Sequence, residues 1–216
     1  TGTGKTASFT LPMIEILASG RAKARMPRSL ILEPTRELAA QVAANFDTYG
    51  KYHKLSKALL IGGTSMAEQL KVLDKGVDVL IATPGRLLDH IRNGDTRFGS
   101  VTHLVLDEAD RMLDMGFIRD VRKIISALPA QRQNLLFSAT MPADVETLAR
   151  DILKSPIKIE IAPDSPAVER IEQFVVRIPR ERKRSALLRL LDDKAWTRII
   201  VFTRTKHAAN RVAKQL

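Results

Sequence analysis

The chain has 216 residues, 44% of them hydrophobic and 27% charged, which is enough for one full domain with a sizeable core and part of a second. It has no cysteine, which excludes disulfides and thiolate metal sites and favours a reducing, cytoplasmic setting, and no apolar run approaches the roughly 20 residues of a membrane-spanning helix. The net charge is +11, and residues 166 to 216 hold 13 Lys and Arg against 5 Asp and Glu, which favours a polyanionic partner, although a solvated helix surface explains this charge equally well.

The chain begins with a short run of small and basic residues: Thr1, Gly2, Thr3, Gly4, Lys5 and Thr6. This run is typical of the second half of a phosphate-binding loop that leads into a helix. Glycines there let backbone N–H groups surround phosphate oxygens, the lysine supplies a positive charge and the threonine hydroxyl can bind Mg²⁺. A flexible turn before a helix is the alternative. The start also lacks Met and a signal-peptide pattern, so we expect a fragment of a longer protein.

Short apolar runs dense in Leu, Ile and Val then alternate with segments of helical spacing. The runs predict strands at 29–34, 57–63, 77–84, 102–110, 133–142 and 198–203. The segments between them predict helices at 36–49, 66–75, 86–92, 118–128 and 142–153. This alternation predicts an α/β fold with a mostly parallel sheet and helices on both faces. Three prolines within 155–172 predict a last strand followed by a linker, with a second unit from about Gln173.

Most of the predicted strands end in a distinctive polar group, so one edge of the sheet is expected to carry the chemistry. The strand over 102–110 delivers Asp107, Glu108 and Asp110 to one point, and burying carboxylates is unfavourable unless positive charge compensates them. Together with Thr6, Asp107 is expected to hold Mg²⁺, and Glu108 to polarise the attacking water of a nucleotidase. The alternative is that Asp107 or Asp110 caps the next helix.

The motifs, taken in order, resemble those of DEAD-box ATP-dependent RNA helicases: TGTGKT, PTREL at 34–38, GG at 62–63, TPGR at 83–86, DEAD at 107–110, SAT at 138–140 and IVFTRTK at 200–206. The continuation RMLDMGF at 111–117 resembles the bacterial members. The resemblance implies a RecA-like domain over 1–162 that binds ATP and Mg²⁺, a linker over 163–172 and the truncated start of a second RecA-like domain over 173–216. The predicted strand of that second part would lack the rest of its sheet, so this part is expected to be poorly packed.

The resemblance also implies roles for single residues. Asp107 and Glu108 would be catalytic, and Thr1 to Thr6 would bind the nucleotide. An RNA platform without base reading would consist of Pro34, Thr35, Arg36, Gly62, Gly63, Thr83, Pro84, Gly85 and Arg86. Coupling of ATP state to strand separation would involve Ser138, Ala139, Thr140 and Asp110.

Several of these residues have a structural alternative. Thr35, Thr83 and Thr140 could cap helices, Pro34 and Pro84 could end strands, and the Gly62-Gly63 pair could be an ordinary turn.

The resemblance implies a whole protein that hydrolyses ATP when stimulated by RNA and locally unwinds RNA duplexes or remodels ribonucleoproteins. RNA is the expected partner, accessory proteins stay unidentified, and no membrane partner is expected. One alternative is a non-catalytic RNA-binding or protein-docking lobe, and another is a nucleotidase acting on DNA. The 216 residues contain neither the family's adenine-recognising segment nor its arginine-finger motif, so little or no activity is expected of them alone.

Overall fold

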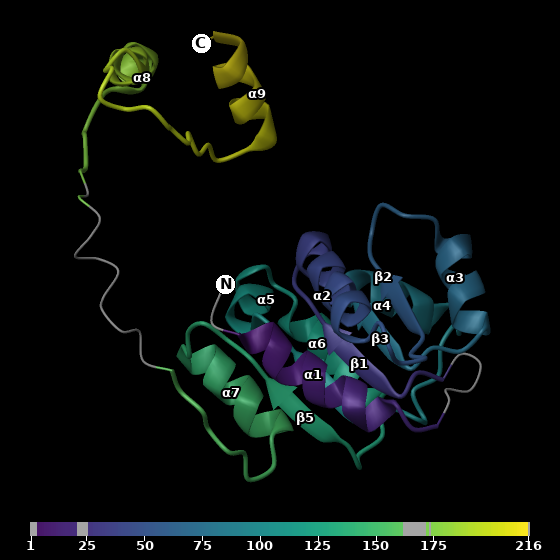
Figure 1. Ribbon diagram of the computed structural model, residues 1–216. Coiled ribbons are helices and arrows are strands. Elements are labelled where there is room, and N and C mark those ends of the chain that lie inside the picture. The colour runs from purple at the N-terminus through teal and green to yellow at the C-terminus, as the bar shows by residue number, and fades with distance from the viewer. Residues whose placement is uncertain (1–3, 21–25, 162–171, 173, 216) are drawn as a thin grey trace. The chain divides into compact units, whose positions relative to one another are not determined.

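The structure is a computed structural model that describes residues 4–20, 26–161, 172 and 174–215. The chain divides into two compact units, Thr1–Ile157 and Lys158–Leu216 (Figure 1). Most of the predicted linker and Gln173 lie outside the described residues, so the predicted domain limits stay a prediction. Within the described ranges, no helix is long and apolar enough to cross a membrane.

The first unit is built on a five-stranded sheet with the order β2-β3-β1-β4-β5, and all four pairs of neighbouring strands are parallel. The strands are β1 (Ser29–Leu32), β2 (Lys57–Leu60), β3 (Val79–Ala82), β4 (His103–Leu106) and β5 (Gln133–Leu136). Every residue of β1 and β3 is buried, which confirms the prediction that both faces of the sheet are covered. Each strand is shorter than its apolar run because pairing stops where the polar turn begins.

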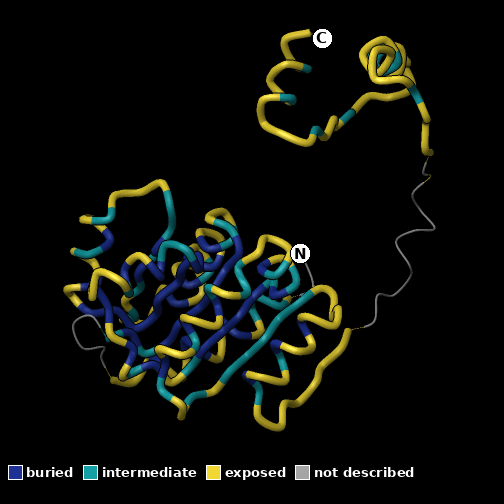
Figure 2. The backbone as a smooth tube through the Cα atoms, turned by 180° about the vertical axis from the view of Figure 1, so that it is seen from behind, coloured by how far each residue is buried: buried dark blue, intermediate teal, exposed yellow. Residues whose placement is uncertain are grey.

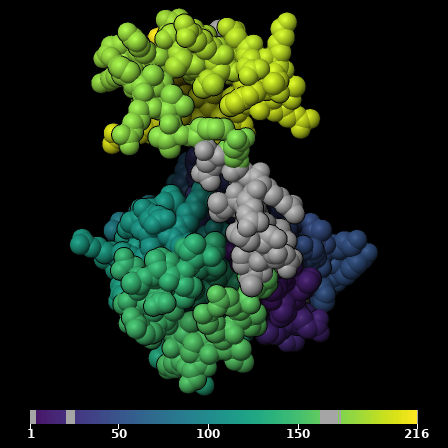
Figure 3. Space-filling view, turned by 90° about the vertical axis from the view of Figure 1, so that its left-hand side faces the viewer, coloured from purple at the N-terminus to yellow at the C-terminus, as the bar shows by residue number. Residues whose placement is uncertain are grey.

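Helices cover the two faces of this sheet. On one face, α1 (Lys5–Leu17) and α2 (Arg36–Tyr49) pack against Ile31, Val79 and Val105 (Figure 1). The other face, which includes Leu30, is covered by α3 (Met66–Asp74), α4 (Pro84–Arg92), α5 (Ala109–Asp114), α6 (Ile118–Ser126) and α7 (Ala143–Ile152). Figure 2 shows the buried strands between these layers, and in Figure 3 the green side chains around α7 lie at the surface.

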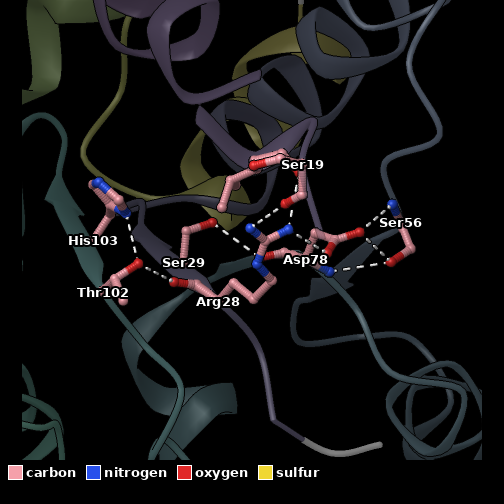
Figure 4. A network of polar contacts seen from close by, with 8 residues as sticks. Ser19, Arg28, Ser29, Ser56, Asp78, Thr102 and His103 are labelled. Atoms are coloured by element: carbon pink, nitrogen blue, oxygen red, sulfur yellow. Dashed lines mark hydrogen bonds and ion pairs between the residues drawn. The ribbon is translucent and has the colours of Figure 1, made fainter. Parts of the chain in front are cut away.

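The amino ends of four strands are joined by a network of paired polar groups (Figure 4). Asp78, which precedes β3, is buried and accepts hydrogen bonds from Arg28 Nη1 at 3.2 Å and from Ser56 N and Oγ at 3.0 and 2.9 Å. The same guanidinium donates to the carbonyls of Leu17 and Ser19. Thr102, which precedes β4, donates to the carbonyl of Arg28. Because these groups satisfy one another, this end of the sheet is a structural anchor.

The second unit corrects two predictions. It contains the short 3₁₀ helix η2 (Arg180–Arg182), α8 (Lys183–Leu191) and α9 (Lys206–Gln215), and none of these elements has a buried residue. The strand predicted at 198–203 is wrong: the segment is irregular, with Ile200 80% and Phe202 90% exposed. The last strand predicted after residue 155 is also wrong, since 157–161 is irregular. Both segments have the composition of strands, but a strand also needs a neighbour to accept its hydrogen bonds, and the structure pairs neither with another described segment.

Candidate active site

The candidate site lies where α1 starts and β1 and β4 end. Gly4 precedes α1 with the left-handed backbone angles φ 76° and ψ 3°, a conformation that glycine adopts without strain. Lys5 and Thr6 form the start of the helix, where unpaired N–H groups and the helix dipole favour an anion. Thr1, Gly2 and Thr3 lie outside the described residues.

A cavity of about 320 Å³ opens beside this helix start. Its lining includes Lys5, Thr6, Glu33, Asp107 and Glu108 together with part of α2. The Lys5 Nζ lies 3.7 Å from Glu108 Oε1, and both side chains are about one-fifth exposed, at 23% and 21%. The predicted phosphate-binding residues and the predicted catalytic carboxylates therefore meet at one place, although they lie about a hundred residues apart in the sequence.

The end of β4 positions the two carboxylates in different ways. Asp107 is buried, and its Oδ1 accepts the N–H of Glu108 at 2.9 Å. Burial raises the pKa of Asp107, and the neighbouring Glu108 charge raises it too, while the hydrogen bond from the Glu108 backbone opposes this rise. Glu108 itself has φ 51° and ψ 49°, a left-handed conformation that is unfavourable for glutamate by about 1–3 kcal/mol. This strained residue turns the chain from the strand into α5 and places its carboxylate beside Lys5.

Asp110 joins the acidic motif to the loop after β5. Its Oδ2 accepts from Thr140 N at 2.9 Å and from Thr140 Oγ1 at 2.8 Å, and its own N–H donates to Ser138 Oγ at 3.1 Å. Burial alone would raise the pKa of Asp110, but the hydrogen bonds from Thr140, Ser138 and the Arg111 N–H lower it below the ordinary value. Ala139 lies between the two hydroxyl residues and offers no polar side chain.

These contacts show whether Asp107, Asp110 and Thr140 cap helices, which was the structural alternative for each of them. Neither Asp107 nor Asp110 caps α5 in the usual way, because each accepts the N–H of the very next residue. The amide of Asp110, in the first turn of α5, donates to Ser138 instead. Thr140 does not cap α7, which starts after Pro142 without a side-chain cap.

The predicted RNA platform lies at the starts of α2 and α4 and in the loop after β2. Arg36 is exposed, and its Nη1 donates to the Gly62 carbonyl at 3.4 Å. Gly63 has φ 82°, a backbone conformation that favours glycine, and it lies so close to the Arg36 guanidinium that a Cβ there would be 2.5 Å from Nη1 and the flexible arginine side chain would have to shift. The structure thus brings the predicted PTR and GG motifs into contact.

The caps of the platform helices differ. Thr35 caps α2 by accepting the N–H of Leu38 at 3.3 Å, so its capping alternative is confirmed, and Pro34 precedes it after the end of β1. Thr83 stands at the cap position of α4 but makes no capping bond with its side chain, and Pro84 begins the helix two residues before the predicted start. Gly85 follows in the first turn, and Arg86 donates to the sulfur of Met66 at 3.3 Å.

A polar network behind the platform was not predicted from the sequence. The buried His90 on α4 lies between Asp95 Oδ2 at 2.8 Å and Gln69 Oε1 at 2.9 Å. Gln69 Nε2 in turn donates to the Ile61 carbonyl at 2.9 Å and to Thr64 Oγ1. These contacts hold both ends of the Gly62-Gly63 loop, and nothing in the sequence spacing indicated that α3 and α4 meet there.

The other residue that the sequence reasoning missed is Glu33, directly after β1. It is 0% exposed and lines the cavity, and neither of its carboxyl oxygens has a hydrogen-bond partner among the described residues. Burial, and then the charges of Asp107 and Glu108, raise the pKa of Glu33 to about 9. The one signal for this residue in the sequence was its charge at the end of the apolar run SLILEP.

Magnesium suits the donor set around the cavity. Thr6 offers a hydroxyl and Asp107 a buried carboxylate, the oxygen ligands that Mg²⁺ prefers. Within the described part of the chain, no group of three or more His, Cys, Asp and Glu side chains is arranged to hold a metal ion by itself. Mg²⁺ usually keeps several waters and binds one or two carboxylates together with substrate phosphates.

Comparisons with known proteins show which family the chain belongs to. The family model described as DEAD/DEAH box helicase matches residues 1–148. The chain is 43% identical to the DEAD-box ATP-dependent RNA helicase RhpA of Helicobacter pylori strain 26695, over 98% of this chain and 42% of RhpA. It is 39% identical to the ATP-dependent RNA helicase RhlB of Shewanella sp. strain ANA-3, over 98% of this chain and 50% of RhlB.

A solved structure, that of a DEAD box protein from the hyperthermophile Methanococcus jannaschii, is 38% identical and matches with a TM-score of 0.69 over 100% of this chain and 56% of that one. The chain spans about half the length of the curated relatives it matches. The residues that match the family model include Lys5, Asp107 and Glu108, and the chain belongs to the DEAD/DEAH box helicase family.

Proposed function

We propose that this chain is the ATP-binding lobe, with the start of a second lobe, of an RNA helicase that couples RNA-stimulated ATP hydrolysis to local duplex unwinding or ribonucleoprotein remodelling. The observation that carries the proposal is the shared cavity of Lys5, Thr6, Asp107 and Glu108. The ATP-dependent RNA helicases among its relatives support the choice of substrate. The absence of cysteine accords with a cytoplasmic setting, which is part of the proposal.

In this proposal, the start of α1 binds the phosphates of ATP. The N–H groups after Gly4 and the charge of Lys5 hold the phosphate oxygens, while Thr6 and Asp107 hold Mg²⁺. The metal ion, when bound, supplies positive charge that neutralises the phosphates during transfer. Glu108 orients the attacking water and accepts its proton, and its fixed place beside Lys5 supports this role.

RNA would lie across the platform formed by the Arg36, Gly62-Gly63 and Thr83–Arg86 segments. The Arg36 guanidinium is exposed, and apart from its 3.4 Å bond to the Gly62 carbonyl its N–H groups have no hydrogen-bond partner among the described residues, so they could bind a phosphate. The starts of α2 and α4 present further N–H donors. Such contacts grip the backbone and do not read bases, so little sequence preference is expected.

Ser138, Ala139 and Thr140 would pass the state of the nucleotide to the rest of the protein. Asp110 belongs to the same short helix start as Glu108, and its three hydrogen bonds to Thr140 and Ser138 tie that helix start to the loop after β5. A movement of Glu108 on hydrolysis would therefore displace this loop. No comparable contact ties the platform to the acidic motif within the described residues.

The proposal is tested on the full-length protein by measuring ATP hydrolysis alone, with RNA and with DNA of the same sequence. We expect RNA to stimulate turnover and DNA to have little effect. Equal stimulation by both would favour a nucleotidase acting on DNA. A lack of ATP hydrolysis under all three conditions would favour a non-catalytic RNA-binding lobe.

A further inference from the structure

Glu33 and Asp107 end neighbouring parallel strands. Leu32 pairs with Leu106 in the ladder between β1 and β4, and Asp107 N donates to the Leu32 carbonyl at 3.1 Å. Ile31 and Val105, two residues earlier in each strand, both pack against the α1 and α2 side of the sheet. Because side chains alternate along a strand, Glu33 and Asp107 continue on that same side, next to each other.

This arrangement gives the cavity an excess of acidic groups. Among the described residues that line it, the carboxyl groups of Glu33, Asp107 and Glu108 face the single ammonium of Lys5. Glu33 is fully buried, and both of its oxygens lack a hydrogen-bond partner among the described residues. An unpaired carboxyl group inside a protein is unfavourable unless a ligand completes its hydrogen bonds. The excess of acceptors favours a cation with its water over a further anion.

We propose that Glu33 is a positioning residue of the magnesium site, whose carboxyl group hydrogen-bonds a water molecule bound to the metal beside Asp107. The inference rests on the proposed function, because it needs Mg²⁺ at Asp107. A bridge through water fits the usual coordination of Mg²⁺, which keeps several waters and binds only one or two carboxylates directly. Such outer groups fix the waters and ligands of a metal and contribute to its affinity.

The test is the affinity of the full-length protein for Mn²⁺ in the presence of ADP, measured from the electron paramagnetic resonance signal of free Mn²⁺. Leucine at position 33 is of roughly similar size to glutamate and removes both oxygens. We expect Glu33→Leu to weaken Mn²⁺ binding about 10- to 100-fold, the usual effect of removing a group that holds a metal ligand. Glu33→Gln should lose less, because its amide oxygen still accepts a hydrogen bond from water.

The same measurement separates a structural role from a metal-positioning role. Asp78→Asn, the matched control at the other end of the sheet, should leave Mn²⁺ affinity unchanged. If Glu33→Leu melts at a lower temperature without metal and binds Mn²⁺ normally, Glu33 is a structural residue and the inference is wrong. If Glu33→Leu and Glu33→Gln both bind Mn²⁺ as the unmodified protein does, it is wrong as well.

Asp107→Asn distinguishes this inference from the proposed function. Loss of Mn²⁺ binding in Asp107→Asn together with normal binding in Glu33→Leu would overturn the role of Glu33 alone. Normal binding in Asp107→Asn would overturn the metal site of the proposed function, and the role of Glu33 with it.

Discussion

The two ends of the central sheet differ in whether a buried carboxyl group has hydrogen-bond partners among the described residues. At the amino end, Asp78 is 4% exposed and its oxygens accept from Arg28 and Ser56 (Figure 4). At the carboxyl end, Glu33 is 0% exposed and has no hydrogen-bond partner among the described residues. A paired buried acid stabilises the fold, whereas an unpaired one stores unfavourable energy that a ligand can relieve. The difference suggests that polar groups at the amino ends of the strands stabilise the fold, whereas those at the carboxyl ends bind ligands.

The largest effects on function are expected when a charged side chain at the carboxyl end of the sheet is replaced. In the full-length protein, we expect Lys5→Ala to abolish ATP binding, because it removes the positive charge on the phosphates. Glu108→Gln should bind ATP normally and stop hydrolysis, because it removes only the group that orients water. A fluorescent nucleotide measures binding, and phosphate release measures turnover.

Both variants should keep the melting temperature within a few degrees of the unmodified protein, since each side chain is partly exposed. Normal turnover by Glu108→Gln would contradict the catalytic assignment. A large loss of stability in either variant would contradict the separation of the two ends.

The complementary change is at the amino end. Asp78→Asn should destabilise the protein by about 2 to 3 kcal/mol, because Arg28 loses a charged partner and the Ser56 donors lose a charged acceptor. Urea unfolding measures the loss. The rate of ATP hydrolysis at saturating ATP should not change at a temperature where the variant is folded, and a specific loss of turnover there would break the comparison.

A smaller effect is expected at the link between the acidic motif and the loop after β5. Changing Ser138 and Thr140 together to Ala should reduce unwinding far more than ATP hydrolysis, because the hydroxyl contacts to Asp110 are lost, leaving only the bond from the Thr140 backbone N–H, while the cavity is untouched. The loss of the Asp110 N–H acceptor should lower stability by about 1 to 2 kcal/mol, which a thermal melt detects. Equal loss of both activities would indicate a damaged fold rather than lost coupling.

The remaining prediction is a pH dependence of stability. The pKa of Glu33 is raised from 4.5 to about 9 in the folded protein, so between these values the folded state holds a proton that the unfolded state releases. The free energy of unfolding should therefore fall as pH rises through this window. Glu33→Gln does not titrate, so its stability relative to the unmodified protein should grow with pH. Urea unfolding without metal or nucleotide measures this, and parallel pH profiles would show that Glu33 does not titrate abnormally.

The sequence predicted the sheet well because its strands are short apolar runs, and β1 and β3 are buried on both faces, a pattern that depends on local composition alone. It also predicted the meeting of Lys5 with Asp107 and Glu108, because carboxyl ends of parallel strands share one edge. It failed at 198–203, since a strand depends on a neighbour that composition does not supply. The burial of Glu33 and the contacts of His90 depend on how separate elements meet, which no local pattern contains.

Because the left-handed backbone at Glu108 is unfavourable for glutamate, selection for stability and selection for ATP hydrolysis should favour different residues at this position. Glycine would adopt φ 51° and ψ 49° without strain, and asparagine would tolerate these angles better than glutamate does. A library of variants screened for heat resistance alone should therefore enrich glycine at position 108. If Glu108 orients the attacking water as proposed, the same library screened for growth that depends on ATP hydrolysis should retain glutamate, and the difference between the two screens would measure the folding energy lost by keeping glutamate there.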